Sequence, residues 1–155
     1  MNIQQHDQSL GYLTGLASRL FNRLLTSRFK QAGIDMTAEQ WGVILTVRNS
    51  VTALSQKQIG EILYLEKSSV SRSINGLVQH GWLRCDFSPE DGRKKLVYLT
   101  DQAHEIADQC AEIAKTVLQD AQVGLTTANL SQCSRELQHV IQNLRILISP
   151  YANDE

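Results

Sequence analysis

The sequence predicts a mainly helical protein with one small β-hairpin, an α+β fold in which helices predominate. Apolar residues recur at helical spacing over most of the 155 residues, and strand-like alternation is confined to residues 83–99. Only two prolines, Pro89 and Pro150, are present, so long uninterrupted helices are possible. Because 42% of the residues are hydrophobic and 20% are charged, the chain can bury a core of ordinary size, and we do not expect disorder to dominate.

The first two helices are predicted in the N-terminal third of the chain. Helical spacing begins at Leu10 and predicts a helix to about Gln31, with Gly33 as a stop signal beyond its end. Thr37 and Gln40 have the spacing of a capping box, so a second helix is expected to start at Thr37. The expected inward stripes are Leu10, Leu13, Ala17, Leu20, Phe21, Leu24 and Leu25, then Trp41, Ile44 and Leu45.

The next two helices form a close pair. Ser55 and Gln58 make a second capping box, and Leu54 and Ile59 occupy the two positions of a hydrophobic staple, so a short third helix begins at Ser55. Helical spacing resumes over about residues 66–80, and Gly81 supplies a left-handed C-terminal cap. The expected buried residues are Ile59, Ile62 and Leu63 in the third helix, and Val70, Ile74, Leu77 and Val78 in the fourth.

A change of period after Gly81 predicts the hairpin. Leu83, Cys85 and Phe87 alternate with polar residues, which indicates a strand on which Cys85 faces inward. Residues 88–92 are rich in turn formers, and residues 95–99 form the returning strand. A two-stranded ribbon is marginal alone, so we expect it to lean on the preceding helices.

Two long helices are predicted after the hairpin. Thr100 or Asp101 is expected to cap the fifth helix, which Gly124 breaks, and Thr126 or Thr127 to cap the sixth. Their apolar stripes contain Ala103, Ile106, Ala107, Cys110, Ile113, Ala114, Val117 and Ala121, then Leu130, Leu137, Ile141, Leu144 and Ile148.

The order of these elements predicts a winged helix-turn-helix. Helices three and four form the helix-turn-helix, whose second member lies in the DNA major groove. The hairpin with its basic tip, Arg93-Lys94-Lys95, follows directly as the wing. We expect one intertwined domain: residues 36–100 form the DNA-binding region, and residues 1–35 and 101–155 a helical dimerisation region. Long apolar stripes in the flanks need a partner surface, and two-fold association is the commonest solution.

Residues 54–100 also resemble the DNA-binding region of the MarR family of bacterial transcriptional regulators. The resemblance rests on LEKSSVSR (residues 65–72), on Leu77 and GWL (81–83), and on SPEDGRKKLVYLT (88–100). The Asp-x-Arg wing followed by the Leu-Thr helix start is the most specific part. The flanking helices match in length and order, so the resemblance covers most of the chain.

This resemblance implies a homodimer that binds palindromic double-stranded DNA. Many members of the family release DNA on binding small aromatic or phenolic compounds, and many repress genes. The resemblance therefore implies a homodimeric transcriptional regulator, either a repressor that a small-molecule effector releases from its operator or a dual regulator that such an effector controls. The effector would lie where the dimerisation helices meet the DNA-binding region. His6, Tyr12 and Trp41 are candidate lining groups, although plain packing would equally explain each of them.

The candidate DNA-binding residues lie at the helix starts, on the fourth helix and on the wing. A polar helix face is usually only solvated, but this one lacks Glu/Lys pairs and carries small hydroxyl groups that suit close approach to phosphates and base edges. Gly76 on that helix suits close DNA approach or tight packing equally. Asp91 is expected to steady the wing loop while Arg93 enters the minor groove. The candidates are Ser55, Ser68, Ser69, Ser71, Arg72, Asn75, Gln79, Asp91, Arg93, Lys94 and Lys95.

Other kinds of site find little support. Cys85, Cys110 and Cys133 lack paired spacing, and we interpret all three as buried structural thiols. The four histidines show no metal-ligand spacing, and no phosphate loop or nucleophile motif is present. We therefore expect no metal, no cofactor and no enzymatic activity. Two alternative functions stay open: a winged helix used for protein contacts, and a regulator that responds to thiol oxidation.

The net charge of the whole chain does not indicate a nucleic-acid partner, whereas the absence of a membrane-spanning pattern and the cysteine content favour the cytoplasm. The net charge is −1, yet residues 54–100 carry seven basic and five acidic side chains, whereas residues 101–155 carry three and eight. A local basic tip can still meet nucleic acid. No apolar run approaches the length of a membrane span, and no secretory signal is recognisable at the N-terminus. The odd number of cysteines also fits a reducing compartment.

Overall fold

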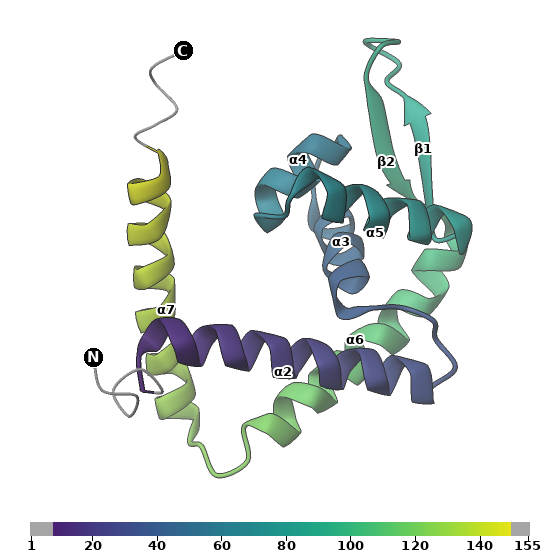
Figure 1. The fold of residues 1–155 in the computed structure, drawn as a ribbon. Helices are drawn as coiled ribbons and strands as arrows, with labels where there is room; N and C mark the ends of the chain where they lie inside the picture. The colour runs from purple at the N-terminus through teal and green to yellow at the C-terminus, as the bar shows by residue number, and fades with distance from the viewer. Residues whose placement is uncertain (1–7, 150–155) are drawn as a thin grey trace. The chain divides into compact units, whose positions relative to one another are not determined.

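A computed structural model describes residues 8–149. It confirms the predicted fold class: helices predominate, and the strands form one antiparallel pair (Figure 1). The predictions that concern His6 and Pro150 lie outside the described residues. The elements are α2 (Leu10–Gln31), α3 (Ala38–Asn49), α4 (Gln56–Leu63), α5 (Lys67–Gln79), β1 (Leu83–Phe87), β2 (Lys95–Leu99), α6 (Asp101–Ala121) and α7 (Thr127–Ile148).

The helix boundaries follow from local hydrogen bonds that the sequence predicts. The Thr37 hydroxyl accepts from the Gln40 backbone N–H at 3.1 Å, and the Gln40 side chain accepts from the Thr37 N–H at 2.9 Å, so the capping box is complete. Ser55 and Gln58 form the second box in the same way. Gly33, Gly81 and Gly124 have φ values of 77°, 76° and 87°, the left-handed conformation expected at helix ends.

The described residues up to Leu118 form one compact unit around an apolar core. This core is built by α3, α4, α5 and the base of the hairpin, with contributions from α2 and α6. Phe29 of α2 stands edge-on to Trp41 of α3 with ring centroids 6.1 Å apart. Leu54 adds a short bridge beside β2, where the Val97 N–H donates to the Leu54 carbonyl at 2.8 Å. The hairpin therefore leans on the helices as predicted.

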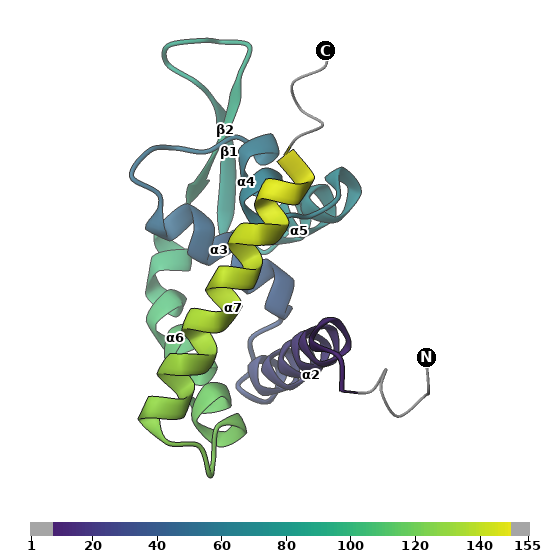
Figure 2. The same cartoon turned by 90° about the vertical axis from the view of Figure 1, so that its left-hand side faces the viewer.

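The hairpin leaves the core soon after it begins. β1 and β2 pair in register from Leu83 opposite Leu99 to Phe87 opposite Lys95. Leu83 is buried, but the rest of β1 is exposed, because the strands run beyond the ends of α4 and α5 (Figures 1 and 2). The prediction that Cys85 is buried is therefore wrong, and Phe87 is exposed as well. Alternation fixes which side of the ribbon a residue faces, but not whether another element covers that residue: Val97 of β2 is buried, whereas Cys85 opposite it is exposed.

Three further burial predictions need correction. Ile62, expected on the buried side of α4, is 51% exposed, because α4 packs on the core through Ile59 and Gly60 and Ile62 lies on the far side of the helix from Gly60. Val78 belongs to the predicted stripe of α5 but is 40% exposed, because it lies at the edge of the side formed by Val70, Ile74 and Leu77. Cys133 is exposed, since α7 has no buried residue in the single chain. Cys110 on α6 is fully buried, as predicted, and burial raises the pKa of its thiol to about 11. It is an inert structural thiol.

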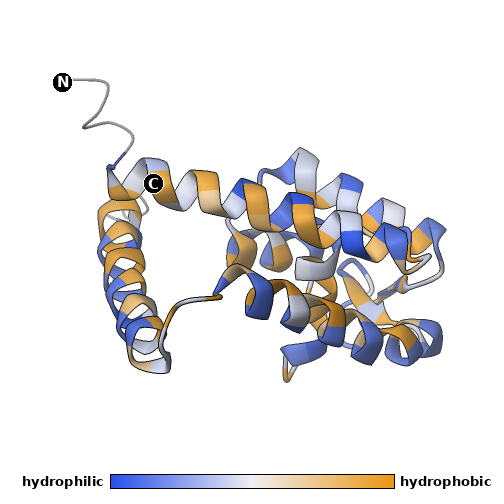
Figure 3. Ribbon diagram, turned by 90° about the horizontal axis from the view of Figure 1, so that it is seen from below, coloured by the Kyte–Doolittle hydropathy of each residue, from blue (hydrophilic) through white to orange (hydrophobic). Residues whose placement is uncertain are grey.

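Many apolar side chains of α2 and α7 are exposed in the single chain. The hydropathy colouring shows apolar residues recurring along both helices (Figure 3). Residues from Gln119 onward form the second compact unit, to which α7 belongs. None of the helices in the part of the chain that the structure describes is long and apolar enough to cross a membrane. The exposed large apolar residues are Leu10, Leu13, Leu20 and Leu24 on α2, and Ile141, Leu144, Ile146, Leu147 and Ile148 on α7.

Candidate nucleic-acid interface

The candidate reading helix, α5, presents a polar face to solvent. It follows α4 through a tight turn in which Tyr64 adopts a left-handed conformation with φ 53°. Burial of Val70, Ile74 and Leu77 fixes the side of α5 that packs on the core. The structure brings the predicted helix residues together on the remaining surface. Ser68, Arg72, Asn75 and Gln79 are exposed, while Ser69 and Ser71 are partly buried beside them.

Gly76 packs against the protein interior and not against the exposed face. A Cβ atom at this position would lie only 2.7 Å from the Nε2 of Gln40, which belongs to α3. One turn earlier, the buried Ser73 hydroxyl donates a hydrogen bond to the Glu39 carboxylate. Of the two roles predicted for Gly76, the structure therefore supports tight packing.

The loop of the wing, residues 88–94, is held by its own hydrogen bonds. The Ser88 hydroxyl accepts from the backbone N–H groups of Glu90 and Asp91 at 3.2 and 3.3 Å. Asp91 Oδ1 accepts from the Arg93 backbone N–H at 3.1 Å and lies 3.6 Å from the Arg93 Nε. Asp91 thus steadies the loop, as the sequence predicts. The Arg93 side chain itself is 95% exposed at the tip.

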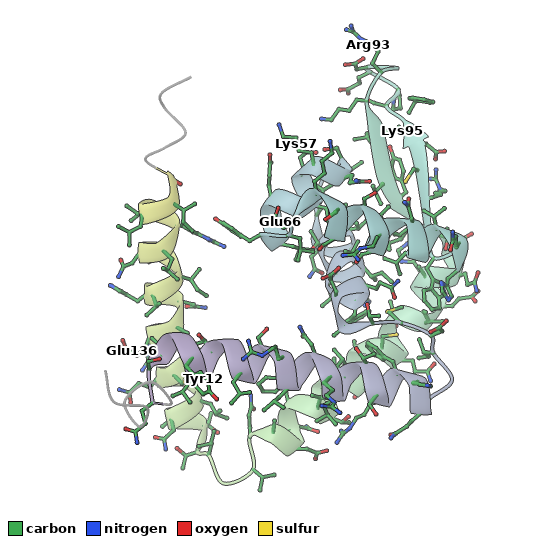
Figure 4. All side chains as sticks on the ribbon, in the orientation of Figure 1. Tyr12, Lys57, Glu66, Arg93, Lys95 and Glu136 are labelled. Atoms are coloured by element: carbon green, nitrogen blue, oxygen red, sulfur yellow. The ribbon has the colours of Figure 1, made fainter. Side chains whose placement is uncertain are left out.

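Basic side chains gather on the winged-helix region (Figure 4). Lys94 and Lys95 are exposed beside Arg93, and the Lys95 ammonium lies 5.5 Å from the centre of the Phe87 ring. Lys57 on α4 was not among the predicted residues, although it stands two positions after the Ser55 cap and its side chain is 86% exposed. The sequence could have indicated Lys57 as a candidate, because the residue lies in the first turn of the predicted helix.

Arg84 is a second cation that the sequence pattern did not single out. It forms an ion pair with Asp86 on the same strand, and its guanidinium lies 4.6 Å from the centre of the Tyr98 ring. Arg84 and Tyr98 are directly opposite each other in the hairpin. These two contacts hold the guanidinium against the wing.

The candidate effector residues do not form one described cluster. Tyr12 is half-buried on α2, whereas Trp41 is 4% exposed and belongs to the core. His6 lies outside the described residues. Within residues 8–149, no group of three or more histidine, cysteine or acidic side chains has the arrangement to hold a metal ion.

An exposed polar helix after a helix-turn-helix turn, joined to a basic wing, defines the class of winged helix-turn-helix DNA-binding proteins. The model of the MarR family matches residues 34–94, which include α3, α4, α5 and β1 and end inside the wing. This chain is similar to transcriptional regulators of the MarR family.

Known proteins with similar sequences are regulators of transcription. The multiple antibiotic resistance protein MarR of Escherichia coli is 27% identical over 104 residues, which make up 67% of this chain and 70% of that protein. The HTH-type transcriptional repressor IacR of Pseudomonas putida is 26% identical over 114 residues, or 74% of this chain and 68% of IacR.

Solved structures share the fold at lower identity. A mutant of E. coli MarR complexed with operator DNA has a TM-score of 0.78 at 23% identity, with 90% of this chain and 99% of that chain covered. BpsR of Bordetella bronchiseptica, whose DNA binding is regulated by 6-hydroxynicotinic acid, has a TM-score of 0.76 at 21% identity, with 86% and 94% covered.

Proposed function

We propose that this protein is a homodimeric, cytoplasmic repressor that binds palindromic operator DNA and is released from it by a small aromatic or phenolic effector. The observation that carries DNA binding is the exposed polar face of α5 beside a wing whose tip bears Arg93, Lys94 and Lys95. The operator complex of the similar MarR structure supports it. The name of IacR as a repressor supports repression.

The proposed docking gives each element a separate task. The face of α5 enters the major groove, where Arg72 and Asn75 suit guanine and adenine edges. Arg93 enters the adjacent minor groove, steadied by Asp91, while Lys94 and Lys95 contact phosphates. Ser55 and Lys57 at the start of α4 are placed for phosphate contacts, because a helix N-terminus attracts anions. Ser68, Ser69, Ser71 and Gln79 complete the surface.

Dimer formation is proposed from the flanking helices. Residues 36–100 contain the DNA-binding region, and residues 1–35 and 101–155 form the dimerisation region. Exposed apolar residues on α2 and α7 would be buried against a second copy. A dimer also matches a palindromic operator, since its two reading helices must lie about one DNA turn apart.

Effector control follows from the same spacing requirement. A compound that alters the separation of the two reading helices would weaken binding by an expected coupling of about 1–3 kcal/mol. Tyr12, Trp41 and His6 are the residues we propose near such a compound. A screen of phenolic and aromatic acids should find one that raises the melting temperature and lowers operator affinity. If none changes either quantity, this effector class is wrong.

The deciding experiment for DNA binding is its salt dependence. A duplex selected by the protein from a randomised library serves as the probe, with a duplex of random sequence as the reference. Affinity for both should fall steeply as salt rises, because phosphate contacts release counterions, while preference for the selected duplex persists. Failure to enrich any duplex would favour the protein-contact alternative instead. Mass spectrometry after mild peroxide tests the thiol alternative, for which the exposed Cys85 and Cys133 are the relevant groups.

A further inference from the structure

One stripe of α5 faces a short polar segment of the chain and not the apolar core. Ser73, Gly76 and His80 are spaced i, i+3 and i+7, and therefore lie along one side of the helix and its C-cap. This stripe borders the apolar one formed by Val70, Ile74 and Leu77, and it carries no predicted DNA contact. Each of its three residues makes a polar or steric contact with a single short segment, residues 35–40.

Each residue of the stripe meets a different member of that segment. The Ser73 hydroxyl, 6% exposed, donates to the Glu39 carboxylate. Gly76 leaves room for the Gln40 amide, which a Cβ atom would meet at 2.7 Å. Farther along, the Nε2 of His80 lies 3.0 Å from the Oδ2 of Asp35. The contacts thus run from the middle of α5 to its C-terminal end.

The segment is itself firmly placed. It consists of the end of the loop that follows α2 and the first turn of α3. The Gln40 side chain that fits over Gly76 also closes the capping box with Thr37, so it cannot move without exposing a helix terminus. The Ala38 backbone N–H donates to the Thr26 hydroxyl of α2 at 2.9 Å, which ties the segment back to that helix.

We propose that residues 35–40 are a positioning segment for the reading helix: Glu39, Gln40 and Asp35 fix the rotation and lengthwise placement of α5, and thereby set operator affinity. None of the three touches DNA in the proposed docking. The proposal rests on operator binding as the function of α5. Residues 35–40 would thus determine operator affinity although they lie outside the DNA-contacting surface.

The outermost contact of the segment titrates. His80 Nδ1 lies 2.8 Å from the Gly76 carbonyl and Nε2 lies near Asp35, so both ring nitrogens face acceptors and the doubly protonated ring satisfies both. The Trp82 ring stacks on the imidazole at 4.8 Å, and Asp35 is the charged group that faces it. The Gly76 carbonyl first, and then Asp35, raise the pKa of His80 above its ordinary value of 6.5.

The sign of the pH effect follows from that direction. A raised pKa means that the positioned state binds the proton more tightly than the released one. The contact therefore contributes fully below pH 6.5 and is lost as the pH rises through the higher pKa of the folded protein. Because the His80 and Asp35 side chains are 35% and 94% exposed, solvent screens the pair, and we expect a modest effect.

The first test adds a Cβ atom at position 76, where the Gln40 amide packs. Gly76→Ala must displace the Gln40 amide, while Gly42→Ala on α3 is the matched control, since its Cβ would have no atom within 4 Å. Gly42→Ala should raise the melting temperature and leave affinity for the selected duplex unchanged. Gly76→Ala should stay folded, because the better helix former offsets the disturbed cap, yet bind the duplex at least about threefold more weakly. Wild-type affinity in the folded variant would overturn the proposal.

The second test changes the charge of the outermost contact. Asp35→Asn keeps a similar shape and an acceptor oxygen, and Asp108→Asn on α6 is the control, since it also removes an exposed carboxylate paired with a cation. Between pH 6 and 8.5, the affinity of wild type and Asp108→Asn for the selected duplex should fall about two- to fivefold more than that of Asp35→Asn. An NMR titration should show that Asp35→Asn lowers the pKa of His80.

The outcomes separate this proposal from the proposed function. If wild-type protein selects no duplex, the proposed function is wrong, and the positioning proposal, which rests on operator binding, is overturned with it. If wild type binds its duplex and the pH profiles of Asp35→Asn and Asp108→Asn coincide, operator binding stands and the positioning role of Asp35 is overturned. Coincident profiles together with a lowered His80 pKa would show that the contact titrates without setting the placement of α5.

Discussion

The winged-helix region buries its large apolar residues within one chain, whereas the flanking helices leave many of theirs exposed. In the former, Ile59, Ile74 and Leu77 are at most 2% exposed within one chain. In the latter, Leu20 of α2 is 56% exposed and Leu144 of α7 is 50% exposed. A region that buries its own core can fold around it, whereas a helix that leaves such residues exposed needs another surface. The comparison separates what the single chain completes from what we propose the dimer supplies.

The largest expected effect is a cavity in the winged-helix core. Ile74→Ala removes a side chain that is 2% exposed and should lower the free energy of unfolding by about 2–5 kcal/mol. Val78→Ala, on the same helix but 40% exposed, should cost under about 1 kcal/mol. Denaturant titration measures both. Equal decreases would contradict the boundary we draw between buried and exposed sides of α5.

The next effect concerns the flanking helices. Leu144→Glu places a charge in the exposed apolar stripe of α7, and it should dissociate the dimer while leaving the winged-helix region folded. Gln142→Glu on the same helix adds the same charge away from that stripe and should stay dimeric. Sedimentation at micromolar concentration distinguishes them, and circular dichroism checks the fold. A dimeric Leu144→Glu variant would remove α7 from the proposed interface.

A smaller effect is expected from the exposed face of α5. Arg72→Ala should cost about 1–3 kcal/mol in binding the selected duplex and relax the preference over random sequence, because the arginine is placed to bind a base edge or a flanking phosphate. Folding and dimer formation should be unchanged, since Arg72 is exposed. Undiminished preference for the selected duplex would contradict the placement of α5 in the major groove.

The smallest effect should come from the wing. Arg93→Ala should weaken binding to selected and random duplexes more evenly, except where a narrow A/T-rich groove rewards the arginine. It should also reduce the magnitude of the salt slope by about one unit for each phosphate that a subunit no longer neutralises. Affinity measured over a range of salt concentrations tests this. A change confined to sequence preference, with an unaltered slope, would assign Arg93 to base readout instead.

Local signals in the sequence predict most of the fold. The Thr37 and Ser55 capping boxes and Gly33, Gly81 and Gly124 mark helix ends, because each acts through atoms within a few residues. Local patterns also predicted that Arg72 on α5 and Arg93 on the wing are exposed: Arg72 lies on the polar side of its helix, and Arg93 lies in the turn-rich loop. Alternation and a loop rich in turn-forming residues predict the two strands of the hairpin.

Contacts between distant residues could not be predicted in this way. The exposure of Cys85 could not be predicted, because alternation does not say how far the ribbon extends beyond the helices. Glu39 and Ser73 are 34 positions apart in the sequence, and Asp35 and His80 are 45 apart, so no local pattern predicts either contact. In the proposed dimer a second chain covers the apolar stripe on α7, and the sequence pattern of one chain does not show such a contact.

The central claim is that two copies of this chain hold two winged helices on one operator. Its most direct test is the mass and footprint of the complex with the selected duplex, measured by sedimentation and by chemical protection of the DNA. We predict two chains per duplex and two protected half-sites about 10 base pairs apart. One chain per duplex, with a single protected site and a stable monomer at micromolar concentration, would contradict this claim.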